Sequence, residues 1–327
     1  MKVFISNYPF GRYDKSAFEA LQKNGFEVVL NPYGRKLLPE ETMELALHCD
    51  VIIAGTEKLD LLVKNSQQLK LIARLGIGLD AIPLKLCREK GIPVCYTPDA
   101  VTQSVVELTI GLLFSALRLI VRAHLDIQAG LWIRHYGKSM SECTVGIIGF
   151  GRVGRSLALH LIPFKPGKVL VNDILDKSKE IAELKALGLN IEFSPKEFIY
   201  KNSDIITLHV PATRLTRNLI DAPQLALFSK DSILINCARG DIVNEDALYD
   251  ALHKKMISGA ALDVFQIEPY SGILKELPNV ILTQHMGACT FSSRIQMENE
   301  CVADIIRFFK GEPLKSPVPE FEYENYD

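Results

Sequence analysis

Short apolar runs alternate with amphipathic segments along most of this chain, and this alternation is the feature that most constrains its fold. In the N-terminal part, the runs have the length and the Val, Ile and Leu content of buried strands at residues 3–6, 28–30, 51–54, 71–75 and 94–96. Helical patterns lie between these runs, as at residues 16–24 and 39–48. Strands that alternate with helices predict crossover connections and a parallel sheet with helices on both faces.

A second series of strand-like runs occupies the rest of the chain. We predict six strands there, at residues 144–148, 169–172, 205–208, 233–236, 259–262 and 280–283. Because 327 residues exceed what one small core organises, two domains are expected. The predicted fold class is therefore α/β with two doubly wound parallel-sheet domains, of which the second matches a dinucleotide-binding sheet.

The segments outside the two series also carry structural signals. One long apolar helix is predicted at residues 104–124, and its lack of a clear polar face favours burial. A polar loop is expected at residues 132–142, a helix at 292–310 and an extended tail at 312–327. The longest apolar stretch, residues 108–121, is shorter than the roughly 20 residues that a membrane helix needs. The N-terminal apolar run is also short for a signal peptide, so a cytoplasmic location is expected.

Composition argues against several classes of partner. The formal net charge is −2, which gives no electrostatic reason to expect nucleic acid or an anionic membrane. Seven cysteines are spread from Cys49 to Cys301 without a CxxC pair, so we expect reduced thiols and no metal site. A small molecule is therefore the expected partner.

A glycine-rich turn follows the first strand of the second series. Its sequence, Gly149-Phe-Gly-Arg-Val-Gly154, opens a predicted helix that ends near residue 162. In the dinucleotide fingerprint, the first glycine permits a tight turn, the second lets the backbone approach a pyrophosphate, and the third lets helix and strand pack closely. The positive end of the helix dipole favours the phosphates. The motif alone also fits a plain tight turn.

The strand after this turn ends in Asp173, which lies 19 positions after Gly154. The fingerprint expects an acidic residue about 20 positions on. A carboxylate there accepts hydrogen bonds from the ribose hydroxyls and repels a 2′-phosphate, which predicts NAD over NADP. Considered alone, Asp173 is equally well explained as a solvated strand end.

Three chemically competent residues follow strands late in the chain. Arg239 can bind a carboxylate in a bidentate manner, which lysine cannot. The imidazole of His285 can donate and accept a proton, and Glu268 can orient its ring and stabilise its charged form. Taken one at a time, they also fit a salt bridge, a capped surface residue and a turn. In their order behind a nucleotide turn, they indicate hydride transfer between a dinucleotide and a 2-oxo acid.

In these residues and in several further motifs, the chain resembles the D-isomer-specific 2-hydroxyacid dehydrogenases. The similarity covers roughly residues 45–310 and rests on a specific combination of short motifs in a fixed order. The motifs besides the glycine-rich turn are Arg74-Leu-Gly-Ile-Gly-Leu-Asp80, Thr97-Pro98, Ser104-Val-Val-Glu107, Leu208-His-Val-Pro211 with Thr213 and Thr216, Asn236-Cys-Ala-Arg-Gly240, Asp263-Val-Phe, Glu268-Pro and His285-Met-Gly-Ala288.

The resemblance implies a role for each candidate residue. Arg239, Glu268 and His285 are implied to be catalytic, with His285 as the proton donor. Substrate binding is implied for the loop Gly76, Ile77 and Gly78 and for Arg74, Arg239 and His285. NAD binding is implied for Thr97, Gly149, Gly151, Arg152, Val153, Gly154, Asp173, Val210, Pro211, Thr216, Cys237, Ala238, Arg239, Asp263, His285, Gly287 and Ala288, with Asp263 at the carboxamide.

The resemblance also implies a split fold. Residues 1–98 and 289–327 would form a flavodoxin-like substrate-binding domain, and residues 99–288 a Rossmann NAD-binding domain. Family members are usually homodimers through the NAD domain, so residues 104–124 are expected near a dimer interface.

Three positions depart from the family pattern. Gln284 stands where the family usually has proline before the catalytic histidine, and Ala81 stands where it often has asparagine. Val106 replaces the usual alanine of the Ser-Val-Ala-Glu motif. Gln284 leaves the imidazole of His285 in place. Ala81 lacks the polar side chain of the family's asparagine and therefore whatever function that side chain has.

The choice of substrate rests on a mild hint. Arg74 precedes the Gly76 loop as in phosphoglycerate dehydrogenases, which favours 3-phosphoglycerate. Glyoxylate, hydroxypyruvate and other small 2-oxo acids are the alternatives. A C-terminal regulatory domain and feedback by serine are not expected. A competing class is an NAD-sensing binding protein, since some relatives of this fold are transcriptional corepressors.

Overall fold

The computed structural model describes residues 1–325, which form two compact units. Unit 1 contains Met1–Val101 and the chain from Ala288 onward, and unit 2 contains Thr102–Gly287. The domain boundaries expected from the family resemblance, at 98/99 and 288/289, stay predictions.

Unit 1 is built on a five-stranded parallel sheet. Its strand order is β2-β1-β3-β4-β5, the flavodoxin-like doubly wound order. The sequence placed all five strands within one residue, because strands buried on both faces are continuous apolar runs. Their bounds are β1 (Lys2–Ile5), β2 (Glu27–Leu30), β3 (Val51–Ala54), β4 (Leu71–Arg74) and β5 (Val94–Tyr96).

Six helices belong to unit 1. The chain returns from unit 2 into α12, which packs on α1, β4 and β5. Thr290 caps this helix, since its side chain accepts a hydrogen bond from the backbone N–H of Ser293 at 3.2 Å. The helices are α1 (Ser16–Lys23), α2 (Pro39–Ala46), α3 (Asp60–Asn65), α4 (Leu84–Glu89), α12 (Phe291–Phe309) and α13 (Glu322–Asn325).

The C-terminal segment is packed, which corrects the extended tail expected at residues 312–327. The N–H of Tyr96 donates to the carbonyl of Ser316 at 3.1 Å, and the N–H of Val318 donates to the carbonyl of Val94 at 2.9 Å. Val318 and Tyr323 are buried in the core of unit 1. These apolar side chains hold the segment against β5 despite its prolines. Residues 326 and 327 of the expected tail lie outside the described residues.

Unit 2 is built on a seven-stranded parallel sheet in the order β12-β11-β10-β9-β6-β7-β8. Counted from β6, this is the Rossmann order 3-2-1-4-5-6 with a seventh strand at one edge. Its strands are β6 (Thr144–Ile148), β7 (Lys168–Asn172), β8 (Ile191–Phe193), β9 (Ile205–Leu208), β10 (Ile233–Asn236), β11 (Gly259–Leu262) and β12 (Val280–Leu282).

The sequence predicted six of these seven strands and missed β8. This strand has three residues, pairs only with β7 and buries only Ile191. An edge strand this short has too few residues to show a periodic pattern.

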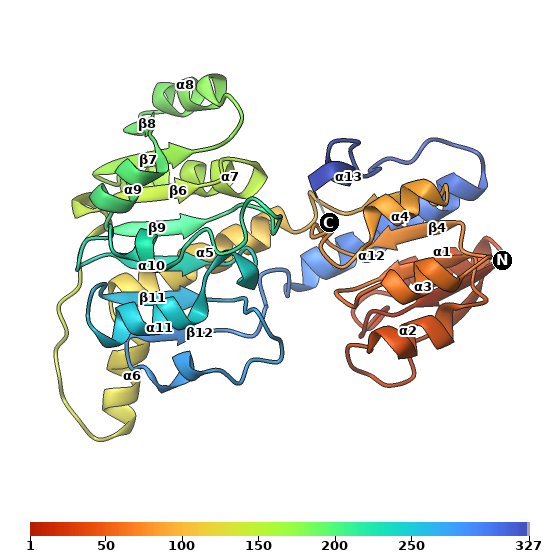
Figure 1. The fold of residues 1–327 in the computed structure, drawn as a ribbon, viewed down its shortest axis with the longest axis horizontal. Coiled ribbons are helices and arrows are strands. Elements are labelled where there is room, and N and C mark those ends of the chain that lie inside the picture. Colours follow the sequence, from red (N-terminus) through yellow and green to blue (C-terminus); the bar gives the residue numbers. More distant parts are fainter. Residues whose placement is uncertain (326–327) are drawn as a thin grey trace. The chain divides into compact units, whose positions relative to one another are not determined.

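Helices cover both faces of each sheet (Figure 1). In unit 2, β6 separates two cores, because Ile147 belongs to the core under α5 and α7, while Ile148 belongs to the core under α9 and α11. The α-helices of unit 2 are α5 (Thr102–Leu117), α6 (Ile120–Gln128), α7 (Arg152–Leu161), α8 (Ser178–Ala186), α9 (Lys196–Asn202), α10 (Ala222–Leu225) and α11 (Glu245–His253). Its 3-10 helices are η1 (Met140–Glu142), η2 (Ile162–Phe164), η3 (Gly240–Ile242) and η4 (Ile273–Glu276).

The single helix predicted at residues 104–124 is wrong, because the chain forms α5 and α6 with a bend of 62° between them. Leu119 lies at the break in the left-handed region, with φ of 56°. An L-residue in this conformation interrupts a right-handed helix. The predicted burial holds for α5, whereas Ile120, Leu125 and Ile127 of α6 are exposed. Within residues 1–325, no single helix is long and apolar enough to cross a membrane, and the bent pair meets the criterion only when its two helices are taken together.

Candidate active site

The three glycines of the turn after β6 have different surroundings. Gly149 has a φ of +92°, and a Cβ there would lie 2.4 Å from the carbonyl oxygen of His209. A Cβ at Gly154 would lie 2.1 Å from the carbonyl oxygen of Gly149, so this glycine lets α7 pack against the turn. A Cβ at Gly151 would meet no atom within 4 Å, so the backbone there borders open space. This arrangement fits a pyrophosphate at Gly151.

The helix α7 begins directly at the turn. Its buried positions, Gly154, Leu157, Ala158 and Leu161, follow the helical period and face the sheet. Arg152 is exposed in the first turn, and Val153 packs against the core beneath. The N-terminus of a ten-residue helix therefore faces the space beside Gly151, where its dipole favours an anion.

Asp173 follows β7 and is bonded to the turn. Its Oδ2 accepts a hydrogen bond from the N–H of Phe150 at 2.7 Å, and its Oδ1 accepts one from Leu175 at 2.9 Å. The carboxylate thus holds the glycine-rich turn at the carboxyl end of β7, where the ribose of a bound dinucleotide is expected. Ile174 beside it is 93% exposed and adds an apolar surface next to the carboxylate.

The loop after β9 carries Val210, Pro211 and Thr216. The hydroxyl of Thr216 donates to the carbonyl of Pro211 at 2.5 Å and accepts from the N–H of Thr213 at 2.8 Å. Its side chain therefore closes this loop at the carboxyl end of the sheet. Burial lowers the pKa of the neighbouring His209 to about 4, so this imidazole is neutral at pH 7.

The loop after β10 presents Cys237, Ala238 and Arg239. Asn236 shapes it, because its side chain accepts from the N–H of Ala238 at 3.0 Å and donates to the carbonyl of Arg239 at 2.8 Å. One guanidinium nitrogen of Arg239 donates to the carbonyl of Ala238 at 2.7 Å. Burial raises the pKa of Cys237 to about 12, so its thiol stays protonated at pH 7.

Gly240 brings this loop against the loop after β11. A Cβ at Gly240 would lie 1.9 Å from the carbonyl carbon of Phe265. Any larger residue would therefore separate Arg239 from the segment that leads to Glu268. The glycine of the Asn-Cys-Ala-Arg-Gly motif is a packing requirement of the site.

Asp263 anchors the segment that carries His285. Its Oδ1 accepts from the N–H of Met286 at 2.9 Å and from the hydroxyl of Thr283 at 2.6 Å, and its Oδ2 accepts from the N–H of Gly287 at 2.9 Å. The backbone carbonyl of Asp263 also accepts from the N–H of His285 at 2.7 Å. Asp263 is expected from the family resemblance at the carboxamide of NAD, and these hydrogen bonds give it an anchoring role besides.

His285 and Glu268 form a hydrogen-bonded pair. Nδ1 of His285 lies 2.8 Å from Oε2 of Glu268 and 3.1 Å from Oε1. His285 has a φ of 49°, a left-handed conformation that non-glycine residues rarely adopt and that often occurs at functional sites. Arg239, Glu268 and His285 thus follow β10, β11 and β12, three adjacent strands of one sheet, at its carboxyl end.

In unit 1, the loop after β4 has the features of a carboxylate-binding loop. Within residues 1–325, the N–H groups of Ile77 and Gly78 donate no hydrogen bond. The N–H of Gly76 donates to the hydroxyl of Thr97 at 2.8 Å, so it supports the loop from inside. Thr97 also pairs its own N–H with the carbonyl of Gly76 at 3.0 Å. Thr97 therefore supports this loop in unit 1, and its expected place near the nicotinamide stays a prediction.

Arg74 is buried beneath the same loop. Its Nε donates to the carbonyl of Gly78 at 2.8 Å, and its Nη1 donates to the carbonyl of Leu75. A Cβ at Gly76 would lie 2.8 Å from Nη1, so the loop wraps closely around the guanidinium. The side chain expected to bind a substrate phosphate is engaged in holding the loop.

Comparisons with known proteins identify relatives among the 2-hydroxyacid dehydrogenases and reductases. Residues 110–287 match the description "D-isomer specific 2-hydroxyacid dehydrogenase, NAD binding domain". The chain is 37% identical over 292 residues to D-3-phosphoglycerate dehydrogenase of Methanocaldococcus jannaschii, covering 86% of this chain and 54% of that protein. It is 32% identical over 309 residues to hydroxypyruvate reductase of Thermotoga maritima, covering 90% of this chain and 98% of that protein.

A solved structure extends the similarity to both units. The crystal structure of D-lactate dehydrogenase from Aquifex aeolicus, complexed with NAD and lactic acid, superimposes with a TM-score of 0.85 at 25% identity. The match covers 97% of this chain and 99% of that one. The chain spans about half the length of the phosphoglycerate dehydrogenase and nearly all of the hydroxypyruvate reductase.

The Rossmann sheet, the glycine-rich turn and the residues after β10 to β12 define the class of protein: a dinucleotide-binding α/β oxidoreductase. Within this class, the chain belongs to the D-isomer specific 2-hydroxyacid dehydrogenase family. Members of this family act on CH–OH groups, and residues 110–287 are its NAD-binding domain. The predicted fold class and the predicted cofactor, NAD, are confirmed.

Proposed function

We propose that the protein reversibly reduces a short 2-oxo acid to the D-2-hydroxy acid with NADH. The observation that carries this proposal is the His285–Glu268 pair on the segment anchored by Asp263. When bound, NAD accepts the hydride and NADH donates it. All other steps fall to side chains and backbone groups of this chain.

His285 is the proposed proton donor. With Nδ1 bonded to Glu268, Nε2 is the nitrogen that gives its proton to the carbonyl oxygen of the substrate during reduction. In the reverse direction, the same nitrogen accepts the hydroxyl proton. Glu268 orients the ring and stabilises its charge, so it is a positioning residue for His285.

Arg239 and the loop after β4 are the proposed binding groups for the 2-oxo acid. A guanidinium can bind the carboxylate in a bidentate manner and polarise the adjacent carbonyl. The N–H groups of Ile77 and Gly78 supply further donors to the carboxylate. The predicted NAD preference rests on the charge of Asp173, which disfavours the 2′-phosphate of NADP.

Two substrate classes fit these groups. Arg74 and the relative from Methanocaldococcus jannaschii support 3-phosphoglycerate, the first expectation from the sequence. The relative from Thermotoga maritima, matched over 98% of its length, supports hydroxypyruvate or another small 2-oxo acid such as glyoxylate. We favour the second class, since the guanidinium of Arg74 is engaged with loop carbonyls.

The proposed function is tested by NADH oxidation with a panel of 2-oxo acids, including glyoxylate, hydroxypyruvate, pyruvate and 3-phosphohydroxypyruvate. Turnover with at least one, lost in His285→Ala while NADH still binds, is the expected result. NADH binding without turnover on any of them would instead favour the alternative of an NAD-sensing binding protein.

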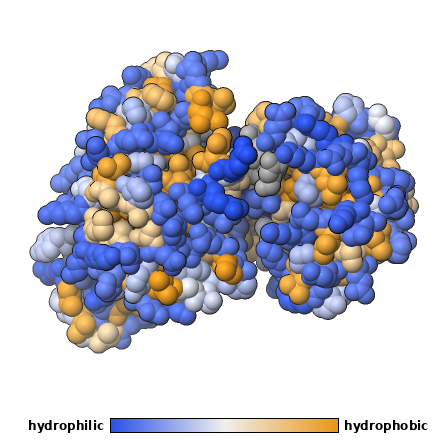
Figure 2. All heavy atoms as spheres, viewed as in Figure 1, coloured by the Kyte–Doolittle hydropathy of each residue, from blue (hydrophilic) through white to orange (hydrophobic). Residues whose placement is uncertain are grey.

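We also propose a homodimer formed through unit 2. In support, α6 and the segment after it expose several large apolar side chains: Ile120, Leu125, Ile127, Leu131, Trp132, Ile133 and Tyr136. Figure 2 shows hydrophobic residues at the surface where Figure 1 draws α6. Apolar patches of this kind mark association surfaces on otherwise polar proteins.

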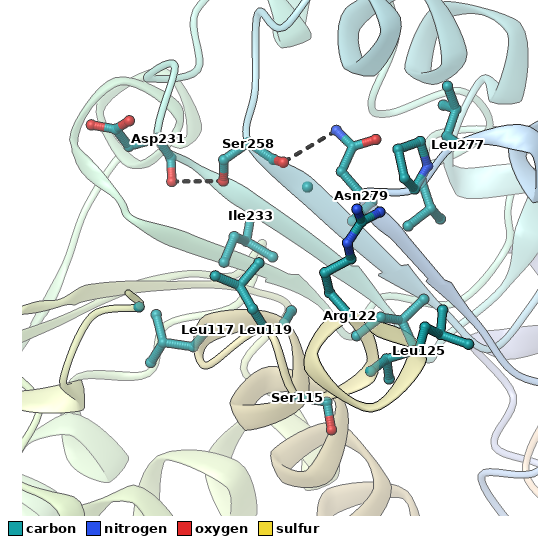
Figure 3. A pocket seen from close by; sticks show the side chains of 18 of the residues that line it. Ser115, Leu117, Leu119, Arg122, Leu125, Asp231, Ile233, Ser258, Leu277 and Asn279 are labelled. Carbon is teal, nitrogen blue, oxygen red and sulfur yellow. Dashed lines mark hydrogen bonds between the residues drawn. The ribbon is translucent and has the colours of Figure 1, made fainter. Parts of the chain in front are cut away.

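A cavity of about 640 Å³ lies beside the same helix, between α5, α6 and the amino ends of β10 to β12 (Figure 3). It is lined by Leu117, Leu119, Leu125 and Ile233 among others and lies at the opposite end of the sheet from Arg239 and His285.

The homodimer is tested by light scattering, which should give the mass of a dimer for the wild-type protein and of a monomer for Trp132→Asp. Tyr33→Ser, an exposed aromatic of unit 1, is the matched control.

The proposed location is the cytoplasm. Six cysteines are buried thiols: Cys49, Cys87, Cys95, Cys143, Cys237 and Cys301. Thiols of this kind are typical of reducing compartments.

A further inference from the structure

A buried carboxylate lies at the carboxyl end of the sheet in unit 1, outside the residues already assigned. The side chain of Glu57 is 3% exposed. Its Oε1 accepts a hydrogen bond from the hydroxyl of Ser6 and another from the N–H of Gly55 at 2.9 Å. Ser6 directly follows β1, and Gly55 directly follows β3. Burying an acid in this way costs free energy unless hydrogen-bond partners compensate for the lost water.

The position of Glu57 is where such a sheet binds ligands. In the order β2-β1-β3-β4-β5, the direction of winding reverses between β1 and β3. Ligands of open α/β sheets bind outside the carboxyl ends of the strands at this reversal. The N–H of Leu75 donates to the carbonyl of Ala54 at 2.9 Å, so the loop of Ile77 and Gly78 begins beside Gly55.

One oxygen of Glu57 remains available to a ligand. Within the described residues, Ser6 and Gly55 bond only Oε1, and Oε2 accepts no hydrogen bond. A Cβ at Gly55 would lie 2.8 Å from Oε2 and 2.9 Å from the side-chain nitrogen of Asn7. The glycine therefore leaves room beside a carboxylate oxygen and an amide donor.

Two arginines of unit 1 near this loop are hydrogen bonded to other groups of the same unit. Arg74 donates to the carbonyls of Leu75 and Gly78. Arg294 pairs with the buried Glu298 at 2.7 Å and donates to the carbonyl of Pro9. The charged side-chain atom nearest to the position of a Cβ at Gly55 is Oε2 of Glu57, at 2.8 Å.

We propose that Glu57, with Asn7, contacts the substituent on the third carbon of the substrate. The two side chains select a neutral hydrogen-bond donor at this position. This inference rests on the proposed function, in which the loop of Ile77 and Gly78 binds the substrate carboxylate. A hydroxyl on the third carbon donates to Oε2 of Glu57. A phosphate or a second carboxylate is disfavoured, because like charges in a partly dry site repel strongly. The substrate class is a 3-hydroxy-2-oxo acid of the hydroxypyruvate type.

The wild-type protein alone provides the first test. With NADH in excess, kcat/KM is measured for glyoxylate, hydroxypyruvate and 3-phosphohydroxypyruvate. The expected kcat/KM for hydroxypyruvate exceeds that for 3-phosphohydroxypyruvate by at least about tenfold, because juxtaposed like charges lower affinity by that much or more. Equal values, or a preference for the phosphorylated acid, overturn the inference.

Glu57→Gln provides the second test, since the amide keeps the shape and one acceptor and removes the charge. The ratio of kcat/KM should move towards 3-phosphohydroxypyruvate by at least about tenfold. Glyoxylate has no third carbon and should change by less than about threefold. Glu40→Gln, an exposed carboxylate in the first turn of α2, is the matched control and should leave the ratio unchanged.

An unchanged ratio in a Glu57→Gln protein that still binds NADH and unfolds cooperatively overturns the inference. If this variant does not fold, Asn7→Ala replaces it, with an expected loss of about tenfold for hydroxypyruvate and little change for glyoxylate. Equal losses for both substrates overturn the inference. Failure of the proposed function looks different, because the wild-type protein would then reduce none of the three acids.

Discussion

Nδ1 of His285 lies 2.8 Å from Oε2 of Glu268, and both side chains are about one-third exposed, at 34% and 28%. The two residues are 17 positions apart and follow β12 and β11, which are neighbours in the sheet. A carboxylate at Nδ1 fixes the tautomer of the ring and directs Nε2 away from the pair. In the proposed mechanism, proton transfer by His285 therefore depends on Glu268.

His285→Ala should lower kcat by about 100- to 10,000-fold, the usual contribution of a general acid. Glu268→Gln keeps an acceptor for Nδ1 and loses the charge, so a smaller loss, about 10- to 100-fold, is expected. Steady-state kinetics measure both losses, and quenching of NADH fluorescence should show retained cofactor binding. Glu197→Gln, an exposed carboxylate of α9, is the control. Full activity in His285→Ala would remove it from the mechanism.

Asp263→Ala should loosen the segment that carries His285. The substitution removes the acceptor for Thr283, Met286 and Gly287, and we expect a loss of about 3 kcal/mol in the free energy of unfolding. Faster amide hydrogen exchange at residues 285–287 and a lower kcat are the direct readouts. Thr283→Val removes a single bond and should cost about 1 kcal/mol. Unchanged exchange in Asp263→Ala would argue against the anchoring role.

Gly151→Ala and Gly154→Ala should separate cofactor binding from folding. At Gly151 a Cβ meets nothing within 4 Å, so thermal unfolding should change little while the Kd for NADH rises at least about tenfold. At Gly154 a Cβ would lie 2.1 Å from the carbonyl oxygen of Gly149, so a loss of about 1–3 kcal/mol in stability is expected. Tight NADH binding by Gly151→Ala would mean that the pyrophosphate does not approach this glycine.

Asp173→Asn should narrow the preference for NAD over NADP. The variant removes the negative charge and keeps one acceptor for the N–H groups of Phe150 and Leu175. A tenfold or larger change in the ratio of kcat/KM for NADH and NADPH is expected, since about 1.4 kcal/mol corresponds to each factor of ten. Glu183→Gln, at the surface of α8, should leave the ratio unchanged. An unaltered ratio in Asp173→Asn would assign cofactor choice to other residues.

Much of the fold could be predicted because it is encoded in local patterns. The five strands of unit 1 and six strands of unit 2 are runs buried on both faces, and such runs are readable in isolation. The exceptions are short or depend on distant contacts. β8 buries only Ile191, the break at Leu119 needs a left-handed residue inside an apolar stretch, and the C-terminal segment is held by pairing with Val94 and Tyr96.

The candidate site shows the same division. Arg239, Glu268 and His285 were named from residue type, order and position after strands, and Glu268 was expected to orient the ring of His285. The use of Asp263 as an anchor was not expected, because its hydrogen bonds reach residues 20 to 24 positions away. Glu57 was missed as well, since its bond to Ser6 spans 51 positions and neither residue belongs to a recognised motif. An acidic residue soon after the third strand was the only local signal.

The sequence by itself determined the strand-helix alternation, the family resemblance, the nucleotide turn and the chemical type of the candidate catalytic residues. Each of these depends on the order of residues along the chain. The tertiary structure decided how individual polar groups are used: Arg74 holds a loop, Thr97 supports it, Asp263 anchors His285, and Glu57 keeps one oxygen available at a strand end. The physical reason is that the role of a polar group depends on its partners, and folding brings those partners from distant parts of the chain.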